Sequence, residues 1–76
     1  MKEILECILK NLVENVEAVS ISQEEKDNQT VFEVKVASED MGKVIGKEGK
    51  NAKAIRNIIR AIGAKENKKV TVEFKD

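Results

Sequence analysis

The sequence predicts an α+β fold with the element order helix, strand, strand, helix, helix, strand. Two segments carry apolar residues at helical spacing, three carry them at alternate positions, and a Gly-x-x-Gly turn separates two helix-compatible segments. The chain has 76 residues, which is close to the lower size limit for a single hydrophobic core. We therefore expect one domain that occupies residues 1–76.

The N-terminal segment, Lys2 to Val16, has the pattern of an amphipathic helix. Charged residues lie opposite a broad apolar face. Cys7 falls outside this face, so we expect its thiol to be exposed or to lie at an interface. The apolar face consists of Ile4, Leu5, Ile8, Leu9, Leu12, Val13 and Val16.

The next segment predicts a β-hairpin, because apolar and polar residues alternate on both sides of an acidic stretch. Val19 and Ile21 mark the first strand, and the stretch from Gln23 to Gln29 is expected to form the turn. The second strand is marked by Phe32, Val34 and Val36.

Two helices are expected after the hairpin. Ser38 can cap a short helix that ends at Gly46, and acidic residues follow it in the first turn. The second helix starts after Gly49, and Gly63 supplies a terminator. Its apolar positions, at the spacing i, i+3, i+4, i+7, are Ile55, Ile58, Ile59 and Ile62.

A last strand is predicted near the C-terminus. It follows a polar loop, Ala64 to Lys69, and its apolar residues again occupy alternate positions. These residues are Val70, Val72 and Phe74.

Charge is segregated along the chain. The 14 basic and 14 acidic residues give a net charge of zero. Between residues 41 and 60, however, six residues are basic and only Glu48 is acidic, which gives this segment +5 and the rest of the chain −5. This distribution predicts an acidic body with one basic, anion-binding face.

Lysines gather at the start of the second helix after the hairpin, where the helix dipole disfavours them. Lys50 and Lys53 lie in its first turn and Lys47 just before it, at a cost of about 0.3–1 kcal/mol each. A bound phosphate would reverse this effect, because free N–H groups and lysines would face one anion. Gly46 and Gly49 would let a sugar-phosphate backbone approach closely. The alternative is an ordinary glycine turn with solvated lysines.

The segment from Val44 to Gly49, followed by Ala52 and Ile55, resembles the K-homology (KH) signature Val-Ile-Gly-x-x-Gly-x-x-Ile. The element order is similar to that of type II KH domains. This resemblance implies a three-stranded mixed sheet covered by three helices on one face, with the minimal KH unit at about residues 30–76. The whole chain, and above all Asp40 to Lys50, resembles the small bacterial single-KH proteins called KhpA. It departs from the signature at Ala52, where a larger aliphatic residue is usual.

The resemblance implies binding of single-stranded RNA, with the Gly-x-x-Gly loop clamping roughly four nucleotides. The clamp corresponds to Gly46, Lys47, Glu48 and Gly49. Residues that would support or line the RNA-binding groove beside this clamp are Val44, Ile45 and Ile55. Basic residues that flank the clamp are Lys43, Lys50 and Lys53.

The far wall of the groove would be the last strand, Lys69 to Phe74, preceded by the variable loop, Gly63 to Lys68. Three lysines could meet the RNA from that side, namely Lys65, Lys68 and Lys69. Arg56 and Arg60 are less specific candidates, because a solvent-facing helix surface is usually charged.

KhpA-like proteins are associated with dimer formation and with a larger KH-containing RNA-binding partner. The resemblance therefore implies a homodimer, such a partner, or both, and a role as a post-transcriptional regulator or RNA chaperone. The helix after Gly49 supports self-association, since Ala54, Ile58 and Ala61 make its apolar arc wider than a small core needs. The alternative function is a KH-fold protein-interaction module whose main role is dimerisation or partner binding.

Enzymatic function is not expected. The chain has no histidine and one cysteine, so it cannot form a zinc site or a cysteine–histidine pair, and we expect no cofactor. A nucleotide-binding phosphate loop is excluded because Gly42 and Gly46 are one residue too close and Glu48 stands where a hydroxyl is needed. Phe32 and Phe74 are expected to face the core, so bases would not stack on aromatic side chains.

A cytoplasmic location is expected. A single cysteine suits a reducing compartment, and charged residues interrupt the N-terminal apolar stretch without a cleavage site after it. Nothing in the chain is long enough to span a bilayer, so we expect no membrane partner.

Overall fold

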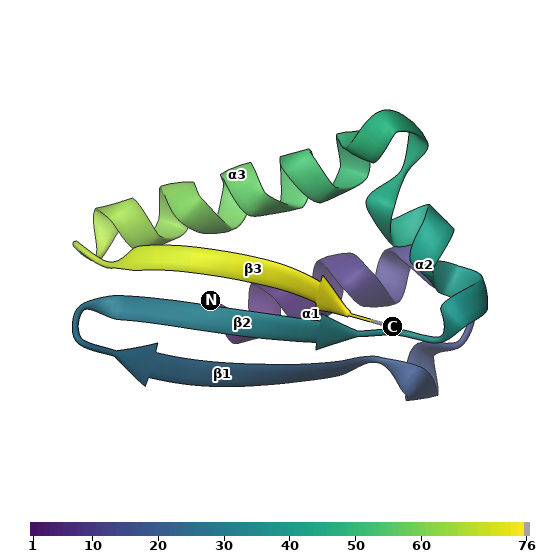
Figure 1. Cartoon of the computed structure of the whole chain (residues 1–76), viewed down its shortest axis with the longest axis horizontal. Helices are drawn as coiled ribbons and strands as arrows, with labels where there is room; N and C mark the ends of the chain where they lie inside the picture. The colour runs from purple at the N-terminus through teal and green to yellow at the C-terminus, as the bar shows by residue number, and fades with distance from the viewer. Residues whose placement is uncertain (76) are drawn as a thin grey trace.

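The computed structural model describes residues 1–75, so Asp76, the last residue of the expected domain, lies outside the described residues. Residues 1–75 form three α-helices, three strands and two short 3₁₀ turns in the expected order, and Figure 1 shows how the helices and strands are arranged. Their bounds are α1 (Lys2–Leu12), η1 (Val16–Ala18), β1 (Ser20–Lys26), β2 (Gln29–Lys35), α2 (Ser38–Ile45), η2 (Lys47–Gly49), α3 (Lys50–Lys65) and β3 (Lys69–Lys75).

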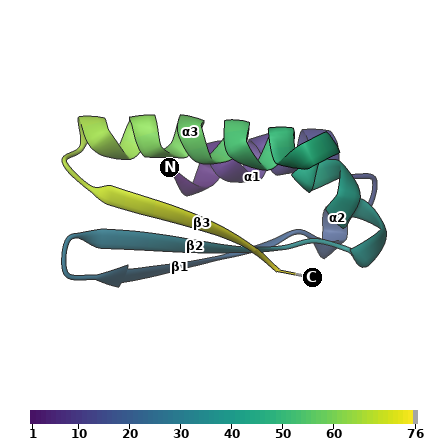
Figure 2. The same ribbon diagram turned by 45° about the horizontal axis from the view of Figure 1, so that its top comes forward.

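The three strands form one mixed sheet in the order β1-β2-β3. β1 pairs antiparallel with β2, and β3 pairs parallel with β2, with Phe32 opposite Val72. Figure 2 shows α1 and α3 over one face of this sheet and α2 at its end. The α+β class, the element order and the helix-covered mixed sheet are therefore confirmed.

The core lies between the helices and the covered face of the sheet. Alternate residues of β2 and β3 point into it, and α1 and α3 supply the opposing side chains. Burying each such side chain contributes roughly 1.5–3 kcal/mol. The largest fully buried apolar side chains are Phe32, Leu5, Leu9, Ile59, Val34 and Val44.

The N-terminal helix is shorter than its apolar pattern predicts. α1 ends at Leu12, and Val13 adopts an extended conformation. The backbone N–H groups of Glu14 and Asn15 then donate to the carboxylate of Asp40 at 3.1 and 3.0 Å. A contact with α2 therefore redirects the chain before Val16, which forms part of a separate 3₁₀ turn.

The hairpin turn is also shorter than the acidic stretch predicts. β1 runs to Lys26 and β2 starts at Gln29, which leaves Asp27 and Asn28 as the turn. Asp27 has a φ of 51°, in the left-handed region that aspartate tolerates in turns. Residues of β1 after Ile21 are exposed on both faces, so they lack the apolar alternation that marks a strand.

Two helix boundaries differ from the predicted ones. Ala37, rather than Ser38, is the N-cap residue of α2, and no side chain among residues 1–75 caps this helix. α3 continues through Gly63 to Lys65. Gly63 is buried against β3, where a Cβ atom would lie 2.3 Å from Cγ2 of Val70. This glycine permits close helix–sheet packing and does not end the helix.

Candidate nucleic-acid interface

The Gly-x-x-Gly loop forms a tight 3₁₀ turn between α2 and α3. Gly46 has φ 77° and ψ 172°, a combination essentially restricted to glycine, and Gly49 has φ 76° and ψ 15°. Glu48 also has a positive φ, 56°. This backbone path brings the loop directly into the N-terminus of α3.

Short contacts hold the loop in place. The N–H of Gly46 donates to the carbonyl of Gly42 at 2.9 Å, and the N–H of Gly49 donates to the carbonyl of Gly46 at 3.1 Å. The side-chain amide of Asn51 donates to the carbonyl of Lys43 at 2.8 Å. A Cβ atom on Gly46 would lie 2.8 to 2.9 Å from atoms of Asn51. Close approach to Asn51 is thus a second reason for glycine at this position.

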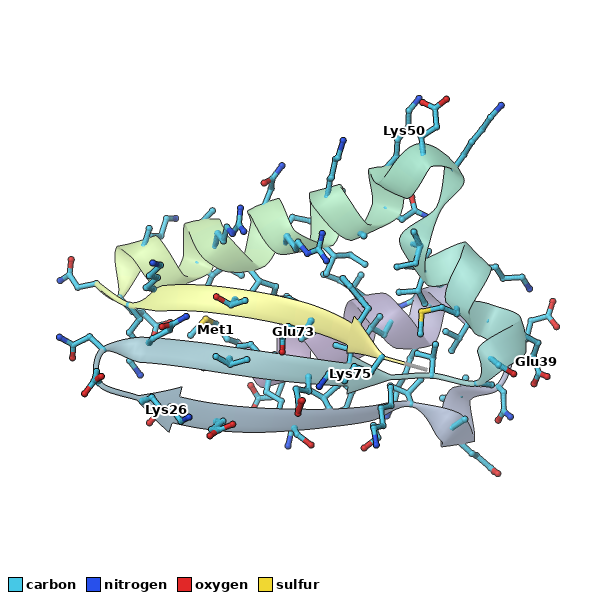
Figure 3. All side chains as sticks on the ribbon, viewed as in Figure 1. Met1, Lys26, Glu39, Lys50, Glu73 and Lys75 are labelled. Carbon is cyan, nitrogen blue, oxygen red and sulfur yellow. The ribbon has the colours of Figure 1, made fainter. Side chains whose placement is uncertain are left out.

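The predicted site residues fall into three groups by exposure. Lys47, Glu48, Lys50 and Lys53 are exposed, and Figure 3 shows Lys50 at the loop end of α3, away from the sheet. The half-buried group is Ile45, Gly46 and Gly49. Val44 and Ile55 are buried and belong to the core.

Among the lysines that flank the loop, Lys43 forms an ion pair within residues 1–75. Its Nζ lies 2.6 Å from a carboxylate oxygen of Glu14, and this bond raises the pKa of Lys43. An exposed pair of this kind contributes little net stability, so a phosphate can compete for the ammonium.

The basic residues of the loop and of α3 remain free of carboxylates. Within residues 1–75, five lysines form ion pairs, and these are Lys10, Lys26, Lys43, Lys68 and Lys75. In the same part of the chain, no carboxylate lies within ion-pair distance of Lys47, Lys50, Lys53, Arg56 or Arg60. On a helix, positions 53, 56 and 60 share one side. We call these five residues the basic stripe.

The variable-loop lysines differ among themselves. Lys68 lies 3.6 Å from a carboxylate oxygen of Glu25 at the hairpin, and Lys69 begins β3. Lys65 is exposed in the last turn of α3. They therefore lie at the end of α3 that is distant from the Gly-x-x-Gly loop.

Asp40 fixes the position of α2 and thereby of the loop. Its side chain is 1% exposed and accepts the two backbone hydrogen bonds from Asn15 and Glu14. These bonds hold the pKa of Asp40 below its ordinary value. The sequence pattern indicated only a helix-dipole role for Asp40, because a contact across the fold leaves no local signal.

A second surface feature is an apolar groove between α1 and α3. It has a volume of about 530 Å³. Ile4 and Ile58 are 44% and 46% exposed beside it, and Ala54, one of the residues that widen the apolar arc of α3, is exposed as well. Cys7 is exposed at its rim. The groove is lined by Ile4, Cys7, Ile8, Asn11, Leu12, Asn51, Ala54, Ile55 and Ile58.

Two further observations concern residues 1–75 only. No group of three or more carboxylate, thiol or imidazole side chains is arranged to hold a metal ion. No helix in this range has the length and apolar character needed to cross a membrane.

Comparison with known proteins identifies the family. The family model described as KhpA/KhpB, KH domain, matches residues 2–74. The chain belongs to the KhpA/KhpB family of KH domains. The match spans α1 to β3, so it includes the Gly-x-x-Gly loop and the basic stripe.

Bacterial members of the KhpA/KhpB family are similar over almost their whole length. RNA-binding protein KhpA of Clostridium acetobutylicum is 52% identical over 74 residues, which cover 97% of this chain and 99% of that protein. RNA-binding protein KhpA of Listeria monocytogenes is 45% identical, with 97% of each chain covered.

A solved structure shares the fold of this KhpA/KhpB-family domain. It is the crystal structure of a variant of Aquifex aeolicus Era bound to GDP·AlF4⁻. The TM-score is 0.64 at 23% identity, over 95% of this chain and 28% of the Era chain. At this identity the likeness concerns the fold alone.

Proposed function

We propose that this protein binds single-stranded RNA, holding the RNA backbone at the loop from Gly46 to Gly49. In this proposal it acts in the bacterial cytoplasm as a post-transcriptional regulator or RNA chaperone. The names of the KhpA relatives, which describe RNA-binding proteins, support the same activity for this chain.

One observation carries the proposal: the free basic stripe begins at an uncapped helix N-terminus. Within residues 1–75 no side chain caps α3, and only the N–H of its first residue, Lys50, is taken up by the loop, where it donates to the carbonyl of Lys47. Lys47, Lys50 and Lys53 surround this end and have no carboxylate partner in that range. A phosphate placed there would gain hydrogen bonds, helix-dipole attraction and ion pairs together.

The proposal is tested by comparing a single-stranded RNA with a duplex of the same length over a range of salt concentrations. We expect the single strand to bind more tightly, because the loop holds a splayed backbone. If three to five phosphates are neutralised, log K should fall with log salt concentration with a slope of about −2 to −4. Equal affinity for both forms at every salt concentration would indicate a nonspecific basic surface.

A second function is favoured by the groove between α1 and α3. We propose that a second copy of the chain covers this groove in a twofold dimer, with a larger KH-containing protein as the alternative occupant. Ile4 and Ile58 expose large apolar side chains on its two sides, and a domain of this size gains stability from association. One KH domain contacts few nucleotides, so a second copy would raise the overall affinity for RNA.

The two functions use different surfaces. On α3, positions 51, 54 and 58 face the groove beside α1, whereas positions 53, 56 and 60 lie on the other side of the helix. A dimer built on the groove would therefore leave the basic stripe free for RNA. The discriminating measurement is salt dependence, since apolar association is far less sensitive to salt than phosphate binding.

A further inference from the structure

Arg56 is held against β3 by two contacts. Its Nε donates to the carbonyl oxygen of Val72 at 3.3 Å. Its guanidinium carbon lies 5.3 Å from the centre of the Phe74 ring. The side chain therefore bridges α3 and β3, and it is half-buried.

These contacts leave the terminal edge of the guanidinium free. Arginine carries five N–H donors in a planar fork, and only Nε is used by Val72. Within residues 1–75, no carboxylate pairs with Arg56. Its two terminal nitrogens thus form a positioned pair of donors, unlike the flexible ammonium groups of the lysines in the stripe.

The location matches the path of RNA from the loop. Arg56 follows Gly49 by two helical turns, which is about 10 Å along the axis of α3. Four stacked nucleotides also span about 10 Å, at about 3.4 Å per step. An RNA whose backbone is held at the loop therefore brings a base to Arg56 within the length that a Gly-x-x-Gly loop clamps.

We propose that Arg56 reads a base rather than a phosphate, and that Phe74 positions it. This inference rests on the proposed RNA-binding function. Two parallel donors recognise a base edge with two neighbouring acceptors. Guanine offers such an edge through O6 and N7, and cytosine through O2 and N3. Adenine places a donor beside its N7 acceptor, and uracil places a donor between two acceptors, so both mismatch the fork.

The role of Phe74 follows from where its ring lies. The sequence led us to expect a core-facing aromatic residue, and Phe74 is half-buried against the edge of the core. Its ring lies against the guanidinium, which restricts the orientations that the donors can adopt. Phe74 is therefore a positioning residue, and the base contacts Arg56.

The test measures binding of oligouridine hexanucleotides that carry one central guest base. The guests are guanine, cytosine, adenine, uracil and 7-deazaguanine, which lacks the N7 acceptor. We expect guanine or cytosine to bind about tenfold more tightly than adenine and uracil. If guanine binds more tightly than 7-deazaguanine, Arg56 contacts O6 and N7 of guanine. If cytosine binds most tightly, Arg56 contacts O2 and N3 of cytosine.

Two variants and a control distinguish recognition of a base by Arg56 from simple attraction by its positive charge. Arg56→Lys keeps the charge but not the fork, so it should bind all guests within about threefold of one another. Arg60→Lys, one turn further along the stripe, should keep the discrimination. Phe74→Leu retains Arg56 and should reduce the preference, with native circular dichroism as the check on folding.

Three outcomes would overturn the assignment. If the wild-type protein binds all five oligonucleotides equally, Arg56 does not recognise a base. If Arg56→Lys lowers the affinity for every oligonucleotide by the same factor, the guanidinium contacts a phosphate and not a base. If no oligonucleotide binds to the wild type, the proposed RNA-binding function itself is wrong, and base reading by Arg56 is wrong with it.

Discussion

The side-chain amide of Asn51 lies 2.8 Å from the carbonyl oxygen of Lys43, so the first turn of α3 is tied to the last turn of α2. This hydrogen bond spans the Gly-x-x-Gly loop. The same side chain occupies the space that a Cβ atom on Gly46 would need. The loop is therefore shaped by its own helices before any ligand binds, and its two glycines are not equivalent.

Alanine substitutions should reveal this difference. Gly46→Ala places a Cβ atom 2.8 Å from Asn51 in a glycine-only conformation, so we expect a loss of about 2–3 kcal/mol in the free energy of unfolding. Gly49→Ala meets nothing within 4 Å and adopts a left-handed helical conformation, at a cost of about 1–2 kcal/mol. Urea unfolding measures both values. A larger loss for Gly49→Ala would contradict the role given to Asn51.

Charge reversal in the loop should abolish RNA binding without unfolding the protein. Changing Lys47 and Glu48 to aspartate takes the loop from neutral to −2 and retains both glycines. Aspartate tolerates the positive φ of Glu48, so melting should change little. We expect affinity for single-stranded RNA to fall by roughly tenfold or more, as for loss of a charge-assisted contact.

A matched control lies at the other end of the molecule. Changing Glu24 and Lys26 to aspartate produces the same change in charge, and Figure 3 shows Lys26 far from Lys50. Affinity should fall much less in this control. If both double variants bind equally, whole-molecule charge rather than the loop determines binding.

Asp40 should make stability depend on pH. Its folded pKa is lowered by the N–H groups of Asn15 and Glu14, so the carboxylate stabilises the fold above its ordinary pKa of about 3.9. That contribution is lost as the pH falls through the lower, folded value. Asp40→Asn turns an NH2 group toward backbone donors, and we expect a melting temperature lower by roughly 5–10 °C at pH 7.

The pH profile distinguishes this role from a general loss of negative charge. Urea unfolding between neutral pH and pH 2 should show a shallower acid decline in Asp40→Asn than in the wild type. Glu39→Gln, an exposed acid in the same turn, should retain the wild-type profile. Identical acid declines in all three proteins would show that Asp40 is not the relevant group.

Self-association should depend on the groove between α1 and α3. Ile58→Asp places a charge where we propose that two copies meet, so the dimer dissociation constant should rise by roughly tenfold or more, measured by sedimentation. Val16→Asp is the control, because Val16 is 40% exposed but lies outside this groove. A monomeric wild-type protein at high micromolar concentration would refute the dimer, and equal effects of both variants would place the interface elsewhere.

Periodicity predicted those elements that bury one face. α1, α3, β2 and β3 each place apolar side chains in the core at regular intervals, which is why their existence and order could be inferred. β1 is an edge strand with little buried surface, so its second half has no apolar pattern, and the sequence predicts a turn there instead of a strand. Gly63 was interpreted as a terminator because a local pattern cannot show that Val70 packs against it.

The loop could be located from sequence because its glycines and lysines are adjacent in the chain. The contacts that fix the position of the loop and of Arg56 could not be predicted from the sequence, because they join segments that are distant in the chain. Asp40 reaches Asn15, and Arg56 reaches Val72 and Phe74. Asn51 carried a weak local signal, being an amide in the first turn after the second glycine, but its bond to Lys43 depends on the angle between two helices.

The parallel pairing of β3 with β2 has a consequence during synthesis on the ribosome. α2, the loop and α3 precede β3 in the chain, so a nascent chain can form the helical part of the site first. Translation from Lys50 to Lys69 takes about one to four seconds at 5–20 residues per second. Until β3 has been added, Arg56 lacks both Val72 and Phe74. A partly synthesised chain would thus carry the proposed phosphate-binding loop before the proposed base contact of Arg56 could form.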